Sequence, residues 1–427
     1  MKIGIIGGGI AGLSAGYYLS KKGHTITIFE PELGGLARAE GTPPLEPYYH
    51  HFFLSDKDLI NLLHELKLEN KIFKKQTPMG FYVNKKLYSF NSPIDLLKFK
   101  PLNIIDRLKL GIMMIYFQKK KDCKNLDTIS VKNWMKKIHG EKIYKTVWKP
   151  LLIAKFTKNA ENIPASWLWG RINPRSKSRE RLKEYLYYPQ GSFNILSNAL
   201  MKNIEKKRGI IIKQKVTKII VKNKNAIKLE TANNSYSFDK YIITIPNPVF
   251  SKLVKLPTQY RKNLENIEYQ EVICMTLYLK NNLTKFYWIN INDKKIPFSG
   301  LIEHTNFIDK KYYKNKNIIY LFNYVHHEHS YLKKSDEEIL KLYISGLKHM
   351  FPGFKESSIL HYKVNRAKYA TPIYDMNYLK KKPAFITPIK NIFLLNTSQI
   401  YPEDRNTSHG IMYAKKLVEL ITESKIK

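Results

Sequence analysis

Residues 2–30, KIGIIGGGIAGLSAGYYLSKKGHTITIFE, contain the pattern that decides the fold. A β-branched run at 2–6 is followed by a glycine-rich turn at 7–12, a helical stretch at 11–22 and a second β run at 25–29. Gly23 separates the helical stretch from the second β run, as glycine commonly does after a helix. This order predicts a βαβ unit with the glycine turn between its first strand and its helix.

The glycines of the turn have the spacing of a nucleotide-binding loop. Gly7, Gly9 and Gly12 fit G-x-G-x-x-G, in which glycine permits a tight turn, lets the backbone approach a pyrophosphate and allows close packing of helix on strand. Ile10 and Ala11 then lie at the helix N-terminus, whose N–H groups face the phosphates. We expect all five residues to contact a dinucleotide.

Glu30 ends the second β run, 18 residues after Gly12. A carboxylate in this place accepts hydrogen bonds from both ribose hydroxyls of an adenosine and repels a 2′-phosphate. The sequence therefore predicts FAD or NAD as the ligand and disfavours NADP.

The residues that follow favour FAD over NAD. Residues 32–38, ELGGLAR, place a second glycine pair and an arginine just past Glu30. This pattern resembles the motif of the flavoprotein superfamily that holds amine oxidases, phytoene desaturases, protoporphyrinogen oxidases and, more distantly, UDP-galactopyranose mutases. The resemblance implies that the pair passes close to the pyrophosphate and ribityl chain of FAD while Arg38 supplies positive charge; without this context, Arg38 would be a solvated surface charge. The cofactor contacts expected here are Gly34, Gly35, Leu36, Ala37 and Arg38.

The resemblance extends to two later segments. Residues 215–219, KVTKI, match the strand that offers a valine backbone to the adenine, which makes Val216 the implied contact. Residues 391–397, NIFLLNT, occupy the strand that in relatives ends in Gly-Asp. Asn396 and Thr397 replace that pair, so the usual role of the aspartate is in doubt, and Glu403 or Asp404 is a candidate replacement.

The last helix is expected to begin at residues 408–410, SHG, and to run to about residue 422. The resemblance places its positive end against flavin N1 and O2, with His409, Gly410 and Ile411 as contacts, where it would stabilise reduced flavin. Alternatively, Ser408 only caps the helix. No cysteine fits the attachment positions of the superfamily, so we expect FAD to be bound non-covalently.

The fold class that these patterns predict is α/β. We expect a Rossmann-type FAD-binding domain assembled from discontinuous segments, an antiparallel-sheet substrate domain, and a helical insert because residues 56–185 read mainly as helices. The expected boundaries are 1–55, 189–250 and 385–427 for the FAD-binding segments, 56–188 for the insert and 251–384 for the substrate sheet and helix.

Two groups of residues are candidates for chemistry and substrate binding. His50 and His51 lie where relatives pass the chain beneath the flavin ring, and they could move protons around hydride transfer or simply pack. Arg171, Arg175 and Arg179 are spaced by four, which on a helix gives one basic face that could clamp phosphate or carboxylate or could be solvated.

The segment at 104–117 is apolar nearly all round and is followed by lysines at 119–121. It is too short to span a membrane and could be a core helix or one that dips into an anionic leaflet, which would imply peripheral membrane contact and a lipid substrate such as a polyprenyl, carotenoid or tetrapyrrole species. The net charge of +38 indicates either an anionic partner or only a biased composition.

The two cysteines, Cys123 and Cys274, form neither a disulfide framework nor a zinc motif. We therefore expect no metal site and a cytoplasmic location, which becomes the cytoplasmic face of a membrane if the apolar helix docks there. We also expect a small-molecule or lipid-linked substrate and no nucleic-acid partner.

The predicted function is that of an FAD-dependent oxidoreductase that transfers hydride between an organic substrate and flavin N5. The alternatives are a reduced-flavin sugar mutase resembling UDP-galactopyranose mutase, and a flavin protein that binds lipid or glycan without turnover.

Overall fold

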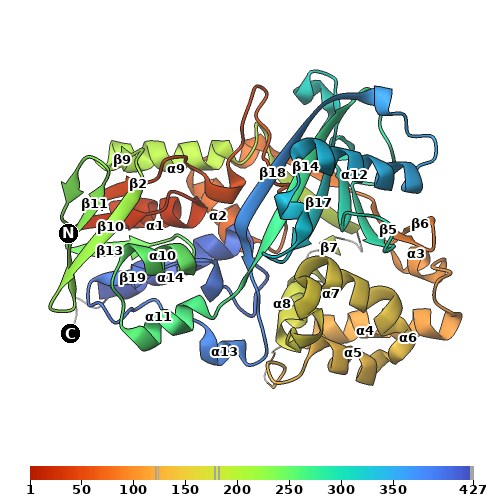
Figure 1. Ribbon diagram of the computed structural model, residues 1–427, viewed down its shortest axis with the longest axis horizontal. Coiled ribbons are helices and arrows are strands. Elements are labelled where there is room, and N and C mark those ends of the chain that lie inside the picture. The colour runs from red at the N-terminus through yellow and green to blue at the C-terminus, as the bar shows by residue number, and fades with distance from the viewer. Residues whose placement is uncertain (121–122, 124, 177–178, 181–182, 424–427) are drawn as a thin grey trace.

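The computed structural model describes residues 1–427 except 121–122, 124, 177–178, 181–182 and 424–427 (Figure 1). Three bodies are apparent: a parallel sheet with its helices on the left of the view, a large second sheet at the upper right, and a block of helices below that second sheet. This arrangement confirms the predicted α/β fold class.

The parallel sheet draws its strands from three distant parts of the chain. Its order is β19-β13-β1-β2-β9, and all its neighbouring strands are parallel. The strands are β1 (Lys2–Ile6), β2 (Thr25–Phe29), β9 (Ile210–Ile212), β13 (Lys240–Ile243) and β19 (Ile392–Leu394). The expected FAD-binding segments thus meet in one sheet, while the exact boundaries stay a prediction.

Both faces of this sheet are covered, which is why its strands are almost continuously apolar. On one face, Ile5 and Ile28 share a core with helices α1 (Ile10–Lys21), α9 (Asn194–Lys206) and α14 (Thr407–Glu423). On the other face, Ile6 and Phe29 pack against a small antiparallel sheet. That sheet consists of β10 (Val216–Lys222), β11 (Asn225–Thr231) and β12 (Ser235–Tyr236).

The second sheet has seven strands in the order β18-β14-β17-β16-β15-β5-β6. It is antiparallel except where β15 runs parallel to β5. Helix α12 (Asp336–Met350) packs on it through Ile339, Tyr343 and Leu347. The strands are β5 (Met79–Val83), β6 (Lys86–Ser89), β14 (Tyr269–Leu279), β15 (Trp288–Asn292), β16 (Gly300–Glu303), β17 (Asn317–Val325) and β18 (Ile359–Pro372).

The block at 56–188 is therefore not helical throughout. It supplies β5 and β6 to the seven-stranded sheet, and β4 (Ile72–Gln76) pairs with β8 (Lys183–Pro189), which also pairs with β3 (Phe52–Phe53). Helix α2 (Lys57–Glu65) packs through Leu59 and Leu62 in the core that α1 and α14 share. The remaining helices share one core of their own. They are α3 (Pro93–Leu97), α4 (Ile104–Lys119), α5 (Val131–His139), α6 (Glu141–Ile143), α7 (Lys149–Phe156) and α8 (Ala165–Ser176).

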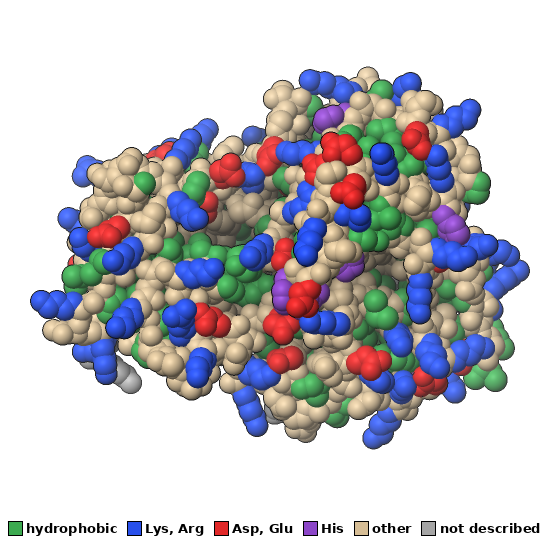
Figure 2. Space-filling view, viewed as in Figure 1, with side chains coloured by type: hydrophobic (Ala, Val, Ile, Leu, Met, Phe, Trp, Pro, Cys, Tyr) green, Lys and Arg blue, Asp and Glu red, His purple; other side chains and the backbone are tan. Residues whose placement is uncertain are grey.

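The surface charge is dispersed. Figure 2 shows Lys and Arg side chains spread over the whole visible face, with acidic side chains among them. Within the described residues, no helix combines the length and the hydrophobicity that a bilayer crossing requires.

Candidate cofactor and substrate site

A single large cavity joins the glycine turn to the helical block and the seven-stranded sheet. Its volume is about 1330 Å³, and its wall includes Gly9 at the turn, Lys155 on α7 and Trp288 on β15. Sites for one small molecule usually enclose about 300–1,000 Å³. The cavity therefore has room for a cofactor and a substrate together.

The three glycines of the turn have different roles. Gly7 has φ of +112°, and an added Cβ there would lie 2.2 Å from Thr244 Oγ1. An added Cβ at Gly12 would lie 2.1 Å from the Gly7 carbonyl oxygen, whereas one at Gly9 would meet nothing nearer than the Gly35 Cα at 3.8 Å. Gly7 and Gly12 thus shape the turn, while Gly9 keeps space open on the cavity side.

Glu30 lies in the cavity wall beside this turn. Its Oε2 accepts a hydrogen bond of 2.9 Å from the Gly8 backbone N–H. Burial raises the pKa of Glu30, and this hydrogen bond opposes the rise. The carboxylate is thus fixed in the cavity wall beside the glycine turn, and the ribose contact stays a prediction.

The second glycine pair lies directly against the first turn. The Gly34 N–H donates to the Gly8 carbonyl oxygen at 2.9 Å, and both Gly34 and Gly35 have positive φ. The residues from Gly34 to Ala37 line the cavity. This close approach of backbone to backbone is possible because neither glycine carries a Cβ.

Besides Ile411 of α14, which is buried in the core, two of the expected cofactor contacts lie outside the cavity wall. Arg38 forms ion pairs with Glu32 and Glu40, so two carboxylates already balance its charge. Val216 is buried in the core beneath the small antiparallel sheet. Their roles in binding FAD stay predictions, and the structure places neither side chain in the wall.

The segment that replaces the Gly-Asp pair does line the cavity, at Asn396 and Thr397. The Asn396 amide donates to the Ile245 carbonyl oxygen at 2.9 Å and to Asn247 Oδ1 at 2.8 Å, and its oxygen accepts from the Ser398 N–H at 3.1 Å. Its backbone N–H donates to Gln399 Oε1 at 2.9 Å, so its side chain and its backbone are both already used and Asn396 shapes the loop.

Helix α14 begins at Thr407, which differs from the expected start at Ser408. Asn406 is the cap, because its Oδ1 accepts from the His409 N–H at 2.8 Å. Ser408 instead accepts a hydrogen bond of 3.1 Å from the Leu59 N–H, so the expectation that Ser408 caps the helix is wrong. The first turn still reaches the cavity through Thr407, His409 and Gly410, whereas Ile411 is in the core.

His50 and His51 both lie in the cavity wall. The Nδ1 of His50 is 2.6 Å from the Tyr48 carbonyl oxygen, and the Nδ1 of His51 is 3.0 Å from the Tyr287 hydroxyl. Burial lowers the pKa of His50 to about 4 and that of His51 to about 3. Both rings are therefore neutral at pH 7, so each can donate one proton but carries no charge to the site.

A charged cluster in the wall was not predicted as a unit. Asp404 Oδ1 accepts from Lys155 Nζ at 2.9 Å, and Asp404 Oδ2 lies 2.7 Å from Arg171 Nη1. Burial lowers the pKa of Lys155 to about 7, against the opposing effect of Asp404. Burial alone would raise the pKa of Asp404, but Arg171 and Lys155 hold it well below its usual range.

Two further guanidinium groups face the cavity. Arg175 lies over the Phe53 ring, 4.7 Å from its centroid, and Arg405 donates to the Tyr324 hydroxyl at 3.3 Å. Across the part of the chain that the structure describes, neither forms an ion pair with a carboxylate, and Arg405 Nε has no hydrogen-bond partner. Arg179 lies in β7 (Arg179–Glu180) instead of α8, so the expected face of three arginines is wrong.

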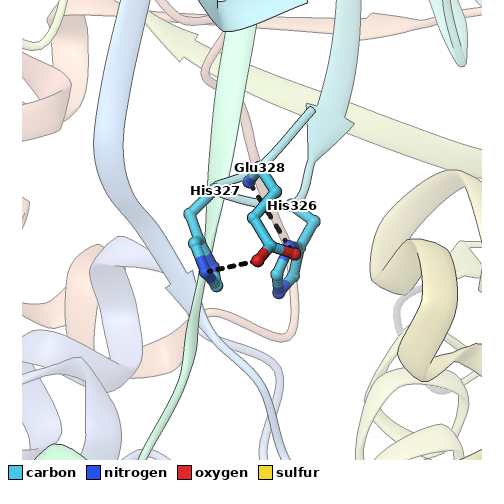
Figure 3. Close-up of side chains that lie close together, drawn as sticks. All are labelled: His326, His327 and Glu328. Atoms are coloured by element: carbon cyan, nitrogen blue, oxygen red, sulfur yellow. Dashed lines mark hydrogen bonds and ion pairs between the residues drawn. The ribbon is translucent and has the colours of Figure 1, made fainter. Parts of the chain in front are cut away.

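A second polar cluster lies outside the cavity wall. His326, His327 and Glu328 follow β17, and their side chains point toward one another (Figure 3). The Nδ1 of His326 is 3.3 Å from Glu328 Oε2, and Lys158 Nζ is 3.8 Å from the same oxygen. The carboxylate thus already has a cation beside it, and the expectation of no metal site stays a prediction.

Comparison with known proteins places this geometry in a family. The family model for flavin-containing amine oxidoreductases matches residues 10–401. The chain belongs to this family. The predicted superfamily, the flavin cofactor and the assignment as an FAD-dependent oxidoreductase are thereby confirmed. No curated protein matches the chain in sequence.

Solved structures match the fold over nearly the whole chain. A candidate protoporphyrinogen oxidase from Exiguobacterium sp. 255-15 has a TM-score of 0.78 and 14% identity over 99% of each chain. An oxidoreductase from Methanosarcina mazei has a TM-score of 0.77 and 18% identity over 98% of this chain and all of that one. A reduced UDP-galactopyranose mutase has a TM-score of 0.77 and 15% identity over 99% of this chain and 95% of that one. At these identities the likeness concerns the fold.

Proposed function

We propose that this flavin oxidoreductase acts on a lipid-like substrate that carries a carboxylate or phosphate group. The observation that carries the proposal is the pair of guanidinium groups, Arg175 and Arg405, that face the cavity without an ion-paired carboxylate among the described residues. A cation removed from water is costly unless an anion approaches it. An anionic group of the substrate would supply that partner.

The rest of the wall on this side is apolar and aromatic, which suits a hydrocarbon body. Helices α3, α4, α7 and α8 contribute most of these side chains. They include Leu96, Leu110, Met114, Leu151, Leu152, Trp167 and Leu168. Burial of apolar surface contributes about 25 cal/mol per Å², so a long hydrocarbon chain would gain most of its affinity here and its orientation from the arginines.

The chain would hold FAD through the two glycine turns, Glu30 and the start of α14. Bound FAD supplies the hydride acceptor of the reaction. The positive end of α14 would stabilise negative charge on reduced flavin, and the neutral rings of His50 and His51 could hold a proton near the substrate. We propose that the bond to FAD is non-covalent, because burial raises the pKa of the thiol of Cys274 in the wall and keeps it a poor nucleophile.

The test is anaerobic reduction of the bound flavin. Holoprotein would be mixed with fatty acids, polyprenyl phosphates and primary amines, and bleaching of the flavin band near about 450 nm would be followed. We expect an anionic lipid to bleach the flavin. Replacing Arg175 or Arg405 by Gln should raise the lipid concentration needed for bleaching by about tenfold or more, which is the effect of losing a charged hydrogen bond. Arg261→Gln is the control, because Arg261 pairs with Glu265 on an exposed helix turn. Bleaching by amines alone would contradict the proposal.

A second candidate is a reduced-flavin sugar mutase. The structural likeness to a reduced UDP-galactopyranose mutase over 99% of this chain favours it, and the same arginines could bind a diphosphate. Turnover of a nucleotide sugar by the reduced but not the oxidised protein would establish this alternative.

Flavin that no substrate bleaches would instead favour a protein that binds without turnover. A lipid-like substrate also implies that the protein works beside a membrane.

A further inference from the structure

Helices α3 and α4 expose a concentrated apolar surface. Of the 18 large hydrophobic side chains that are exposed in the described residues, eight lie between residues 94 and 116, so these side chains are not scattered singly. The eight form the α3–α4 face. They are Ile94, Leu97, Ile104, Ile105, Leu108, Ile112, Ile115 and Tyr116, each 44–67% exposed.

The α4 helix is apolar on two opposite sides for two different reasons. Leu110, Met113 and Phe117 are at most 3% exposed and pack in the core of the helical block. Ile105, Leu108 and Ile112 lie on the other side, at the spacing of a helical stripe. A helix that only filled the core would have polar residues on that second side, so the stripe offers an apolar surface on which a partner could dock.

The charges around the face indicate what that partner is. Lys98, Lys100, Lys109 and Lys119 are exposed beside it. The two carboxylates in the same stretch are already engaged: Asp95 accepts hydrogen bonds in the cap of α3, and Asp106 lies 3.7 Å from Lys142. An apolar stripe flanked by lysines fits an anionic bilayer, where the hydrocarbon region receives the stripe and the headgroups receive the lysines.

The same two helices form part of the cavity wall. Leu96 of α3 and Gly111 and Met114 of α4 line the cavity, and Ile115 lines it while being 54% exposed. The cavity thus reaches the α3–α4 face at Ile115. A hydrocarbon chain leaving a bilayer at this face would enter an apolar space without crossing water.

We propose that the α3–α4 face docks on an anionic membrane leaflet and that the cavity receives its substrate directly from the bilayer. The docking stands by itself, whereas the passage of substrate rests on the proposed lipid-like function. Vesicle binding and flavin reduction therefore test them separately.

The experiment is flotation of the FAD-loaded protein with vesicles of phosphatidylcholine, with and without phosphatidylglycerol. We expect binding to the anionic vesicles that weakens with salt, and binding at least about tenfold weaker to neutral ones. Ile105→Ser, Leu108→Ser and Ile112→Ser together should lower the partition coefficient by about tenfold or more. A matched control replaces Ile210, Ile227 and Ile386, which are 44–58% exposed elsewhere, by Ser and should bind as the unaltered protein does.

Several outcomes would overturn the proposal. Equal losses in the two triple variants would mean that binding is not localised to the face, and equal binding to neutral vesicles would exclude the anionic leaflet. A dimer that the α3–α4 variant converts to a monomer, with no vesicle binding, would make the face a self-association surface. The double variant Lys98→Glu, Lys109→Glu leaves the apolar stripe intact and tests the lysines separately. It should also bind anionic vesicles more weakly than the unaltered protein. If the unaltered protein does not bind vesicles but its flavin is reduced by dispersed lipid substrate, docking alone is refuted. If it binds vesicles but no anionic lipid reduces its flavin, the proposed function alone is refuted.

Discussion

The carboxylate of Asp404 accepts a hydrogen bond of 2.9 Å from the ammonium group of Lys155 on the wall of the cavity, and Arg171 approaches its other oxygen at 2.7 Å. The side chains of all three are at most 25% exposed. Below about pH 7, where Lys155 is an ammonium group, two cations are thus held beside one anion where water can screen them only in part. The stability of this wall depends on that single negative charge.

Asp404→Asn should therefore destabilise the protein strongly. The amide has nearly the same shape but leaves Lys155 and Arg171 without an anion, and breaking a buried ion pair from one side typically costs about 3–5 kcal/mol. We expect the free energy of unfolding to fall by about 3 kcal/mol, at the lower end of this range, because the three side chains are partly hydrated. Urea unfolding of the apoprotein measures it. Asp375→Asn is the control: Asp375 pairs with Lys381 at a site nearly half exposed, where the loss should be below about 1 kcal/mol. Similar losses in the two variants would show that the cluster is effectively solvated.

The glycine turn allows the demands of the fold to be separated from those of the cofactor. An added Cβ at Gly9 has open space, so Gly9→Ala should leave the thermal midpoint of the apoprotein within about 2 °C while FAD binding falls by about tenfold or more, since the methyl occupies cofactor space. Gly12→Ala drives a Cβ to 2.1 Å from the Gly7 carbonyl oxygen and should lower the midpoint itself. Normal FAD binding by a folded Gly9→Ala protein would contradict the assigned role of the turn.

The turn could be predicted from sequence because everything that shapes it is local, from the strand before Gly7 to the acid at Glu30. The charged cluster could not, since Asp404 lies 249 positions from Lys155 and 233 from Arg171, and no local pattern links residues on α7, α8 and the loop before α14. Strand β5 forms a local hairpin with β6, but its place in the seven-stranded sheet depends on a distant partner. Its partner β15 is more than 200 positions away, with Phe81 opposite Asn290.

Smaller errors also have physical causes. Both Asn406 and Ser408 are good helix caps, and the choice between them was made by a tertiary contact, the hydrogen bond from the Leu59 N–H to Ser408. Periodicity alone continued the arginine spacing from Arg171 through Arg179, whereas α8 ends at Ser176. The partner of Ser408 lies far outside the sequence window that produced the prediction, whereas Arg179 itself belongs to the strand that follows α8.

Glu30 provides a direct test of adenosine recognition. Glu30→Ala removes the acceptor expected for the ribose hydroxyls and should weaken FAD binding by about 10- to 100-fold, the size of a lost charged hydrogen bond of about 1.5–3 kcal/mol. Fluorescence of the flavin that is released into the dialysate measures the weaker binding. Glu32→Gln is the matched control, because Glu32 is 67% exposed, pairs with Arg38 and lies outside the cavity wall. Equal retention of FAD by the two variants would remove Glu30 from the cofactor site.

Lys155 should make the binding of an anionic ligand depend on pH near neutrality. Because burial lowers the pKa of Lys155 to about 7, the side chain is an ammonium group below that pH and neutral above it. Affinity for an anion should thus be highest near about pH 6 and fall by about five- to tenfold by about pH 8, the effect of losing one nearby cation in a partly dry site. Decanesulfonate is a suitable probe, since its own charge is fixed, and perturbation of the flavin spectrum reports its binding. Lys155→Met should bind decanesulfonate weakly, with an affinity that does not change between about pH 6 and about pH 8. Lys415→Met is the control and should keep the fall in affinity, because Lys415 pairs with Asp58 outside the cavity wall. A step that survives in Lys155→Met would assign the titration to another group.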